Sequence, residues 1–332
     1  MNKAKKNIRA IIPVAGIGTR LRPHTYTLPK VLLTVAGKPI LGHILDKIYL
    51  EGIREATIVV GHFGEMVEEY VRKHHSNLHV DFILQDELLG LGHSIYVARE
   101  TFDHDPIFII LGDTIFDVEL QAVLNSSSTS LGVKVVDDPR RFGVAVLKNK
   151  YIERLVEKAD PPVSNLALVG LYYIKHSALL KECIRTLIEE DIRTKNEYQL
   201  TDALQLMIER GERMTTFRVD GWFDCGKPET LLSTNQHLLN QKSTVRKIAG
   251  VVINPPVFIS SSADIKNSII GPYTTIADHS VIEDSVIRNS IVSQEAHVKQ
   301  ALLENSIIGN GAVIKGSYQR VNAGDSSEME FV

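Results

Sequence analysis

The chain has 332 residues, of which 44% are hydrophobic, and a formal net charge of -3 at pH 7. This length exceeds one typical core, so we expect a globular chain of two domains. The charge is nearly balanced and forms no concentrated basic stripe, which argues against a nucleic acid as the main partner. The apolar run at 8–14 is too short for a signal peptide, and no run approaches a membrane span. We therefore expect a cytoplasmic protein without a membrane partner.

Only two cysteines occur, Cys183 and Cys225, and they lie in distant segments. Their spacing gives neither a disulfide framework nor a metal-ligand pattern. We expect both to be reduced and structural.

The first predicted strand, residues 8–14, runs into a loop that contains two glycines. Gly16 and Gly18 let the backbone approach a phosphate closely, and the successive N–H groups of such a loop form an anion-binding nest. Arg20 and Lys30 add cationic donors. These features together predict a loop that binds a triphosphate.

The same letters exclude two better-known phosphate loops. A dinucleotide fingerprint needs a third glycine where Leu21 stands and a helix where Pro23 interrupts, and the P-loop lysine signature is missing. Two glycines after a buried strand often form only a tight turn. The prediction therefore rests on the whole string from Gly16 to Lys30.

Up to about residue 125, apolar strand-like runs alternate with helical patterns. Nearly continuous apolar strands are typical of a sheet with both faces covered, and the alternation predicts a mostly parallel sheet with right-handed crossovers. Ligands bind such sheets beyond the carboxyl ends of the strands, where the first loop, Gln85 and Asp113 fall. The predicted strands are 8–14, 56–60, 80–84 and 107–111, and the predicted helices are 39–50, 65–74 and 93–100.

Between residues 130 and 220 the pattern becomes less regular. We interpret this stretch as a second half of the same domain, and we expect one more helix, at 228–239, before a polar linker. The predicted strands are 131–136, 144–147 and 167–174, and the predicted helices are 178–189 and 201–209.

After residue 241 an apolar residue recurs every six positions. This period is typical of a parallel β-helix, in which one side chain per flat face points inward and each turn packs on its neighbours. An ordinary antiparallel domain would alternate with period two. We therefore predict domains at 1–241 and 242–322 and a loose tail at 323–332. The predicted inward residues are Ile270, Ile276, Ile282, Val286, Val292, Val298, Leu302, Ile308 and Ile314.

Asp113 follows the apolar strand at 107–111 and a glycine. A carboxylate at the ligand edge of a sheet is a good magnesium ligand, although a strand-end aspartate also serves as a helix cap.

The string from Gly16 to Lys30 resembles the signature of the sugar nucleotidyltransferases, the NDP-sugar pyrophosphorylases, which carry G-x-G-T-R-x-x-P followed by P-K. The resemblance runs through most of the chain. It implies a Rossmann-like α/β fold, with a mixed, mostly parallel sheet flanked by helices, followed by a short left-handed β-helix of hexapeptide repeats. It also implies catalytic roles for Arg20 and Lys30. The nucleotide-binding residues that it implies are Ala15, Gly16, Gly18, Thr19, Gln85 and Gly90.

The resemblance extends to the sugar and metal sites. It implies that Asp113 and Asp224 hold Mg²⁺, although Cys225 stands where the family usually has threonine. Leu168 replaces the asparagine common in hexosamine and mannose enzymes, which favours glucose. The segment 196–202 would help to shape the sugar pocket, and His93 is interpreted as an N-terminal helix residue. The implied sugar-phosphate residues are Gly143, Glu157, Lys158, Leu168 and Tyr172.

The sequence thus predicts an enzyme that joins a nucleoside triphosphate, dTTP or UTP, to a hexose 1-phosphate, glucose 1-phosphate first. Two alternatives stay open. One is a non-catalytic regulatory subunit that binds a sugar nucleotide. The other is a bifunctional enzyme whose β-helix transfers an acyl group with His279 or His297 as base. The ends of a short solenoid leave surface uncovered, so we expect a homo-oligomer.

Overall fold

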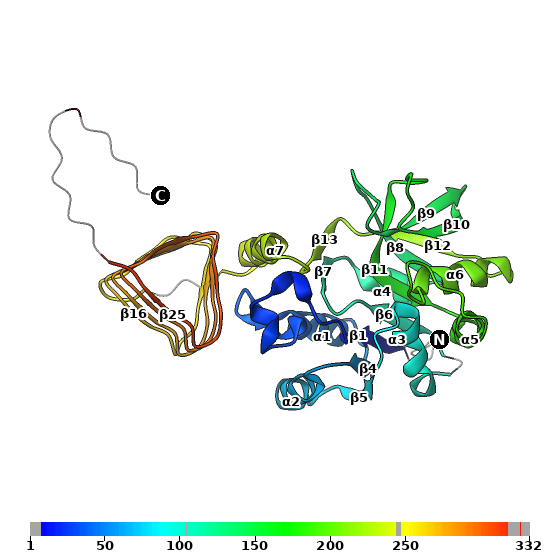
Figure 1. Cartoon of the computed structure of the whole chain (residues 1–332), viewed down its shortest axis with the longest axis horizontal. Helices are drawn as coiled ribbons and strands as arrows, with labels where there is room; N and C mark the ends of the chain where they lie inside the picture. The colour runs from blue at the N-terminus through cyan, green and yellow to red at the C-terminus, as the bar shows by residue number, and fades with distance from the viewer. Residues whose placement is uncertain (1–7, 104, 244–246, 318–325, 327–332) are drawn as a thin grey trace, which may run out of the picture. The chain divides into compact units, whose positions relative to one another are not determined.

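The computed structural model describes residues 8–103, 105–243, 247–317 and 326. It divides into two compact units (Figure 1). The α/β unit comprises Met1–Leu33 and Lys38–Thr234, and the coil unit comprises Thr34–Gly37 and Asn235–Val332. The domain boundary predicted after residue 241 stays a prediction, and the predicted tail at 323–332 lies outside the described residues except for Ser326. No helix in the described part of the chain is both long and apolar enough to cross a membrane.

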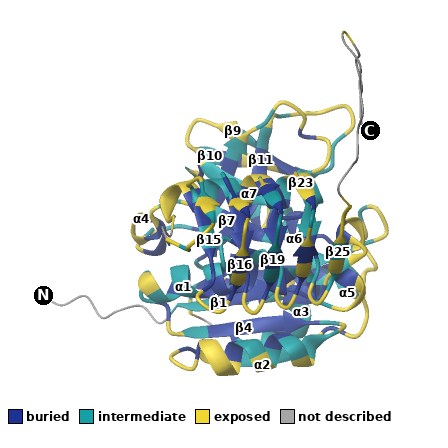
Figure 2. Ribbon diagram, turned by 90° about the vertical axis from the view of Figure 1, so that its left-hand side faces the viewer, coloured by how far each residue is buried: buried dark blue, intermediate teal, exposed yellow. Residues whose placement is uncertain are grey.

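A mostly parallel arrangement forms one half of the central sheet of the α/β unit. Strand β1 (Arg9–Pro13) lies between β6 (Ile107–Ile110) and β4 (Glu55–Val60), and all three run parallel. Strand β5 (His79–Leu84) pairs with β4 in the same direction. Figure 2 shows β4 as largely buried. Strand β5 is only partly buried, unlike the prediction, because it is an edge strand.

The helices between these strands bury one apolar face each, as their periodicity predicts. In α1 (Ile40–Leu50), the buried side chains include Leu41, Ile44 and Ile48, three to four positions apart. Helix α2 (Gly64–His74) also matches the prediction. Helix α3 (Leu91–Val97) starts earlier than predicted, directly after Gly90, and a 3₁₀ turn at Arg99–Thr101 follows it.

The strands of the other half of the sheet pair mostly in the antiparallel manner. Strand β11 (Leu166–Ile174) pairs with β6, β8 and β9, so it joins the two halves. Strand β10 (Tyr151–Glu157) was not predicted, because two charged residues interrupt its apolar pattern at an edge of the sheet. The remaining strands are β8 (Ser130–Val135), β9 (Gly143–Lys148) and β12 (Thr215–Arg218), and the helices are α4 (Leu120–Leu124), α5 (Ser177–Glu189) and α6 (Leu200–Glu209).

Short elements connect these layers. Strand β7 (Thr114–Asp117) continues from β6 and pairs with β13 (Gly221–Asp224) in a separate antiparallel ribbon. Helix α7 (Pro228–Gln241) follows β13. The loop after β1 contains three 3₁₀ turns, Thr19–Leu21, His24–Tyr26 and Lys30–Leu32, and then the two-residue strands β2 (Thr34–Val35) and β3 (Lys38–Pro39).

The coil unit is the left-handed parallel β-helix that the repeat predicts. Within the described residues it has three sheets of four parallel strands each, stacked as a triangular coil (Figure 1). The first sheet contains β14 (Val252–Ile253), β17 (Ile269–Ile270), β20 (Val286–Arg288) and β23 (Leu302–Glu304). The second contains β15 (Val257–Ile259), β18 (Thr274–Ile276), β21 (Ile291–Val292) and β24 (Ile307–Ile308). The third contains β16 (Asp264–Lys266), β19 (Val281–Glu283), β22 (His297–Lys299) and β25 (Val313–Lys315).

The strict six-residue period was wrong at two of the predicted inward positions. Ile287 is fully buried and faces Ile270 in register, whereas Val286 lies outside, and Leu302 is 84% exposed. Successive inward residues lie either six or five positions apart, because the corners of the coil differ in length: Ile276 and Ile282 are six positions apart, whereas Ile282 and Ile287 are five apart. A strict six-residue step therefore selects the neighbour of the inward residue at the shorter corners, and neighbouring strand residues face opposite sides.

A buried amide holds the short N-terminal segment of the coil unit. Asn235 is fully buried, and its Oδ1 accepts from the Ala36 backbone N–H at 2.8 Å and from the Thr275 hydroxyl at 2.7 Å. Its Nδ2 donates to the Tyr273 carbonyl at 3.1 Å. These bonds satisfy a polar group that would otherwise be costly to bury.

The Ile282→Ala variant should lower the free energy of unfolding of the coil unit by about 2–5 kcal/mol, because it removes a fully buried side chain and leaves a cavity. Urea unfolding followed by circular dichroism would measure the change. The matched control is Leu302→Ala, at the 84% exposed position, which should change stability by less than about 0.5 kcal/mol. Equal losses in both variants would contradict the inward assignment of Ile282.

Candidate active site

The carboxyl end of β6 packs directly on the chain that leaves β1. A Cβ at Gly112 would lie 2.4 Å from Val14 Cγ1 and 2.9 Å from the Pro13 carbonyl, so only glycine fits there. The Gly112 N–H donates to the same Pro13 carbonyl at 3.2 Å. Asp113 is thereby placed next to the glycine loop at the ligand edge of the sheet.

The glycine loop folds over the lysine predicted to be catalytic. Gly18 has a left-handed φ of 69°, and a Cβ there would lie 3.1 Å from Lys30 Cβ. The Thr25 hydroxyl donates to the Gly18 carbonyl at 2.8 Å and holds this turn. Lys30 Nζ then reaches Asp113 Oδ2 at 2.5 Å. Two residues far apart in the sequence are thus paired.

The ribbon of β7 and β13 brings in the second predicted carboxylate. Asp224 is the register partner of Thr114, and the Cys225 N–H donates to the Asp113 carbonyl at 2.9 Å. A Cβ at Gly226 would lie 2.7 Å from both Arg20 Nη2 and Asp224 Oδ1. The four predicted catalytic and metal residues therefore meet at one place.

The surroundings of Asp224 disfavour its ionised form. Burial raises the pKa of Asp224, and the Asp113 carboxylate raises it further, while Lys30, Arg20 and Arg141 oppose the shift. No group of three or more metal-ligating side chains occurs among the described residues. Magnesium needs only one or two carboxylates when phosphate oxygens complete its shell. The pair Asp113 and Asp224 fits this chemistry, and a cation would relieve their repulsion.

A second cluster gathers most of the predicted sugar-phosphate residues. Strands β9 and β10 place Gly143 opposite Glu157, and a Cβ at Gly143 would lie 2.9 Å from Glu157 Oε2 and 3.1 Å from Leu168 Cδ1. The Thr201 hydroxyl donates to Glu157 Oε2 at 2.7 Å. Lys158 Nζ lies 3.3 Å from Glu157 Oε1. One face of this cluster is therefore acidic and hydroxyl-bearing, and the other is the apolar Leu168.

Tyr172 interacts electrostatically with a carboxylate of each cluster, Glu157 and Asp113. Burial raises its pKa, and the carboxylates of Glu157 and Asp113 raise it further. The phenol therefore stays protonated and neutral at pH 7.

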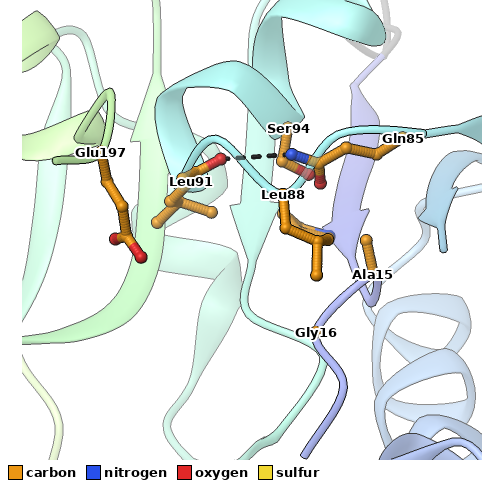
Figure 3. A pocket seen from close by; sticks show the side chains of 9 residues that line it. Ala15, Gly16, Gln85, Leu88, Leu91, Ser94 and Glu197 are labelled. Carbon is orange, nitrogen blue, oxygen red and sulfur yellow. Dashed lines mark hydrogen bonds between the residues drawn. The ribbon is translucent and has the colours of Figure 1, made fainter. Parts of the chain in front are cut away.

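A cavity of about 300 Å³ adjoins the first residues of the glycine loop (Figure 3). Ala15, Gly16, Gln85 and Gly90, four of the residues predicted to bind the nucleotide, line it, whereas Gly18 and Thr19 belong to the part of the loop near Lys30. Leu88, Leu91, Ser94 and Glu197 complete most of its wall.

The polar side chains in the wall of this cavity are buried, and some of them contact one another. Gln85 is 4% exposed, and its Nε2 donates to the Gly90 carbonyl at 3.4 Å and lies 3.1 Å from His93 Nδ1. The hydroxyl of Ser94 is buried and has no hydrogen-bond partner among the described residues. His93 therefore does more than begin a helix.

Sequence reasoning missed several residues of this region. The positive charge of Arg141 opposes the rise in the pKa of Asp224, and Gly226 allows Arg20 and Asp224 to approach each other. Arg141 directly precedes Phe142-Gly143, and Gly226 directly follows Asp224-Cys225, so each lies next to a predicted site. Their roles depend on contacts between distant segments, for which one sequence carries no signal.

The model of one protein family, "Nucleotidyl transferase", matches residues 9–241 of the chain. The chain belongs to this family. The match covers the central sheet and both clusters, and it confirms the enzyme class that the glycine loop predicts.

Named relatives extend this finding. The chain is 30% identical to a low-salt glycan biosynthesis nucleotidyltransferase of Haloferax volcanii, over 88% of this chain and 89% of that protein. It is also 30% identical to a glucose-1-phosphate thymidylyltransferase of Streptomyces griseus, over 88% of both. A bifunctional protein GlmU of Methanococcus maripaludis is 35% identical over 74% of this chain, but the chain covers only 57% of that protein.

A solved structure shares the fold. A structure described as a putative glucose-1-phosphate thymidylyltransferase from Bacillus anthracis, in complex with sucrose, superposes with a TM-score of 0.61 at 26% identity. It covers 72% of this chain and 98% of its own.

Asp224→Asn should stabilise the metal-free protein at pH 7. The folded-state pKa of Asp224 is raised above 3.8, so the native state holds this proton longer than the unfolded state does. Stability from this group is therefore lost as pH rises from 3.8 through the folded pKa, and the asparagine variant avoids that loss.

Urea unfolding in EDTA would measure this effect. The variant should gain stability over the parent at pH 7 and gain less at about pH 3, where the Asp224 carboxyl group is largely protonated in both the folded and the unfolded chain. Asp220→Asn, at an exposed carboxylate close in sequence, is the matched control and should show no such pH dependence. A loss of stability at pH 7 in Asp224→Asn would contradict the charge imbalance.

Proposed function

We propose that this enzyme transfers a nucleotidyl group from UTP or dTTP to glucose 1-phosphate, producing a nucleoside diphosphate glucose and pyrophosphate. The observation that carries the proposal is the meeting of Arg20, Lys30, Asp113 and Asp224 at one sheet edge. Two cations and two carboxylates in one place suit a reaction that moves phosphate charge.

The reaction needs positioning more than covalent chemistry. A phosphate oxygen of the sugar phosphate attacks the α-phosphorus of the triphosphate in line, and the bond to pyrophosphate breaks. Arg20 and Lys30 would bind the triphosphate and offset the charge that grows on the leaving group. Asp113 and Asp224 would hold Mg²⁺, which polarises the phosphate oxygens when bound. No side chain need form a bond to phosphorus.

The nucleotide would lie along the glycine loop with its base in the cavity. Ala15, Gly16, Gln85 and Gly90 line that cavity, while Gly18 and Thr19 would contact phosphates. The similarity to a glucose-1-phosphate thymidylyltransferase supports a pyrimidine nucleotide. The amide of Gln85 is the group suited to read the base edge.

The sugar would bind in the acidic cluster. Glu157, supported by the Thr201 hydroxyl, would accept hydrogen bonds from sugar hydroxyls, and Gly143 leaves room above them. Lys158 would bind the 1-phosphate, and Tyr172 would stay a neutral donor beside the sugar. Leu168 presents an apolar surface, which favours a hexose without an N-acetyl group over a hexosamine.

The described residues favour no second activity. His279 and His297, the candidate bases for acyl transfer, are both exposed on the coil. Nucleotidyl transfer is therefore the one function proposed.

Pyrophosphate release with Mg²⁺ would test the proposal, using dTTP, UTP, GTP, CTP and ATP against glucose, galactose, mannose, glucosamine and N-acetylglucosamine 1-phosphates. Release should be greatest for glucose 1-phosphate with UTP or dTTP. Asp113→Asn should lower kcat by at least about 100-fold, because it removes a metal ligand. Nucleotide binding without turnover in the parent protein would favour a regulatory subunit instead.

Glu157→Gln should raise the KM for glucose 1-phosphate by about 10-fold, because a charge-assisted hydrogen bond to the sugar is lost. The KM for the nucleotide should stay within about 2-fold. Glu153→Gln, on the same strand but exposed, is the matched control and should change neither value. An equal effect of the two substitutions would refute the sugar assignment.

A further inference from the structure

The orientation of the Gln85 amide is fixed by two neighbours. The Gly90 carbonyl can only accept a hydrogen bond, so the Gln85 atom 3.4 Å from it must be the amide nitrogen. The same nitrogen lies 3.1 Å from His93 Nδ1, which must then be an unprotonated acceptor. With this amide orientation, the form of His93 that can accept the hydrogen bond is the neutral tautomer with its proton on Nε2.

The surroundings of His93 support this neutral form. Burial lowers the pKa of His93 below 6.5, and this effect outweighs the opposing backbone and carboxylate of Glu87. At pH 7 the ring can therefore accept the Gln85 N–H. The 3.1 Å contact is the shorter of the two that hold the amide, so the ring is the main constraint on its orientation.

The oxygen of the amide is left for a ligand. Among the described residues, both hydrogen-bond contacts of the Gln85 side chain use Nε2. Its Oε1 is not one of the buried atoms without a partner, and Gln85 lines the cavity (Figure 3). The polar group that Gln85 offers to the cavity is therefore an acceptor.

We propose that His93 is a positioning residue that sets base selectivity, because it holds the Gln85 nitrogen and turns the Gln85 carbonyl oxygen toward the nucleotide base. The inference rests on the proposed function. A base with an N–H at this point, such as N3–H of uracil or thymine, donates to the oxygen. Cytosine has a lone pair at N3, so the two acceptors face each other without a proton.

Equilibrium binding of UTP and CTP, with Mg²⁺ and without sugar phosphate, would test the role of His93. His93→Leu removes the acceptor with little change of volume. The Gln85 amide can then flip, so that its oxygen and nitrogen exchange positions. The ratio of the CTP to the UTP dissociation constant should then fall by about 10-fold. His93→Asn keeps an oxygen acceptor near the position of Nδ1, and the ratio should stay within about 2-fold of the parent value.

A double-mutant cycle would show whether His93 acts through Gln85. Gln85→Ala should lower the ratio by itself, and adding His93→Leu should lower it no further. A ratio unchanged in His93→Leu, or a further fall in the double variant, would overturn the proposal. A purely structural role of His93 would weaken UTP and CTP binding equally and would also overturn it.

The outcome is separable from the fate of the proposed function. Pyrophosphate release by the parent protein reports on nucleotidyl transfer, whereas the ratio of dissociation constants reports on the base site alone. Turnover with an unchanged ratio in His93→Leu would reject only the role of His93. Selective binding without turnover in the parent would reject only the proposed reaction.

Discussion

The close placement of two carboxylates in a partly buried position is the constraint on which the site depends. Asp113 is held by the packing of Gly112 against Pro13 and Val14, and Asp224 arrives on the ribbon that β7 and β13 form. Burial disfavours ionisation of Asp224 and raises its pKa, and the like charge of Asp113 raises it further. The fold accepts this cost at the edge of the sheet where parallel strands end and ligands bind.

Two further parts of the α/β unit contact or pair with the elements that carry these two carboxylates. On one side, the 3₁₀ turns after β1 carry Lys30 to Asp113 beneath Gly18. On the other, β11 pairs with the parallel half of the sheet and with the strands that carry the sugar cluster. The parallel first half and the mostly antiparallel second half thus place the proposed nucleotide cavity and the acidic cluster near one pair of carboxylates.

Much of this was predictable where the sequence signal is local. The run at 107–111 and the string from Gly16 to Lys30 identified the sheet, its edge and the loop, because apolar continuity and glycine spacing reflect the backbone directly. Strand β10 was missed because Glu153 and Arg154 face outward at an edge. The coil register failed at Val286, since a shorter corner makes Ile287 the inward residue, whereas Val292 and Val298 are buried as predicted. His93 was read as a helix residue because its contact with Gln85 depends on the path of the intervening loop.

Cys225 has a chemical consequence of its own. It follows a predicted metal ligand, yet burial raises the pKa of its thiol to about 12, and its sulfur contacts the Thr234 hydroxyl at 3.5 Å. Nucleophilic attack by cysteine requires the thiolate, which is almost absent at neutral pH under these conditions. Cys225, which stands in place of the usual threonine, therefore gives the site no reactive thiol at neutral pH. Alkylating and oxidising agents should therefore react slowly with this sulfur, although it lies beside a predicted metal ligand.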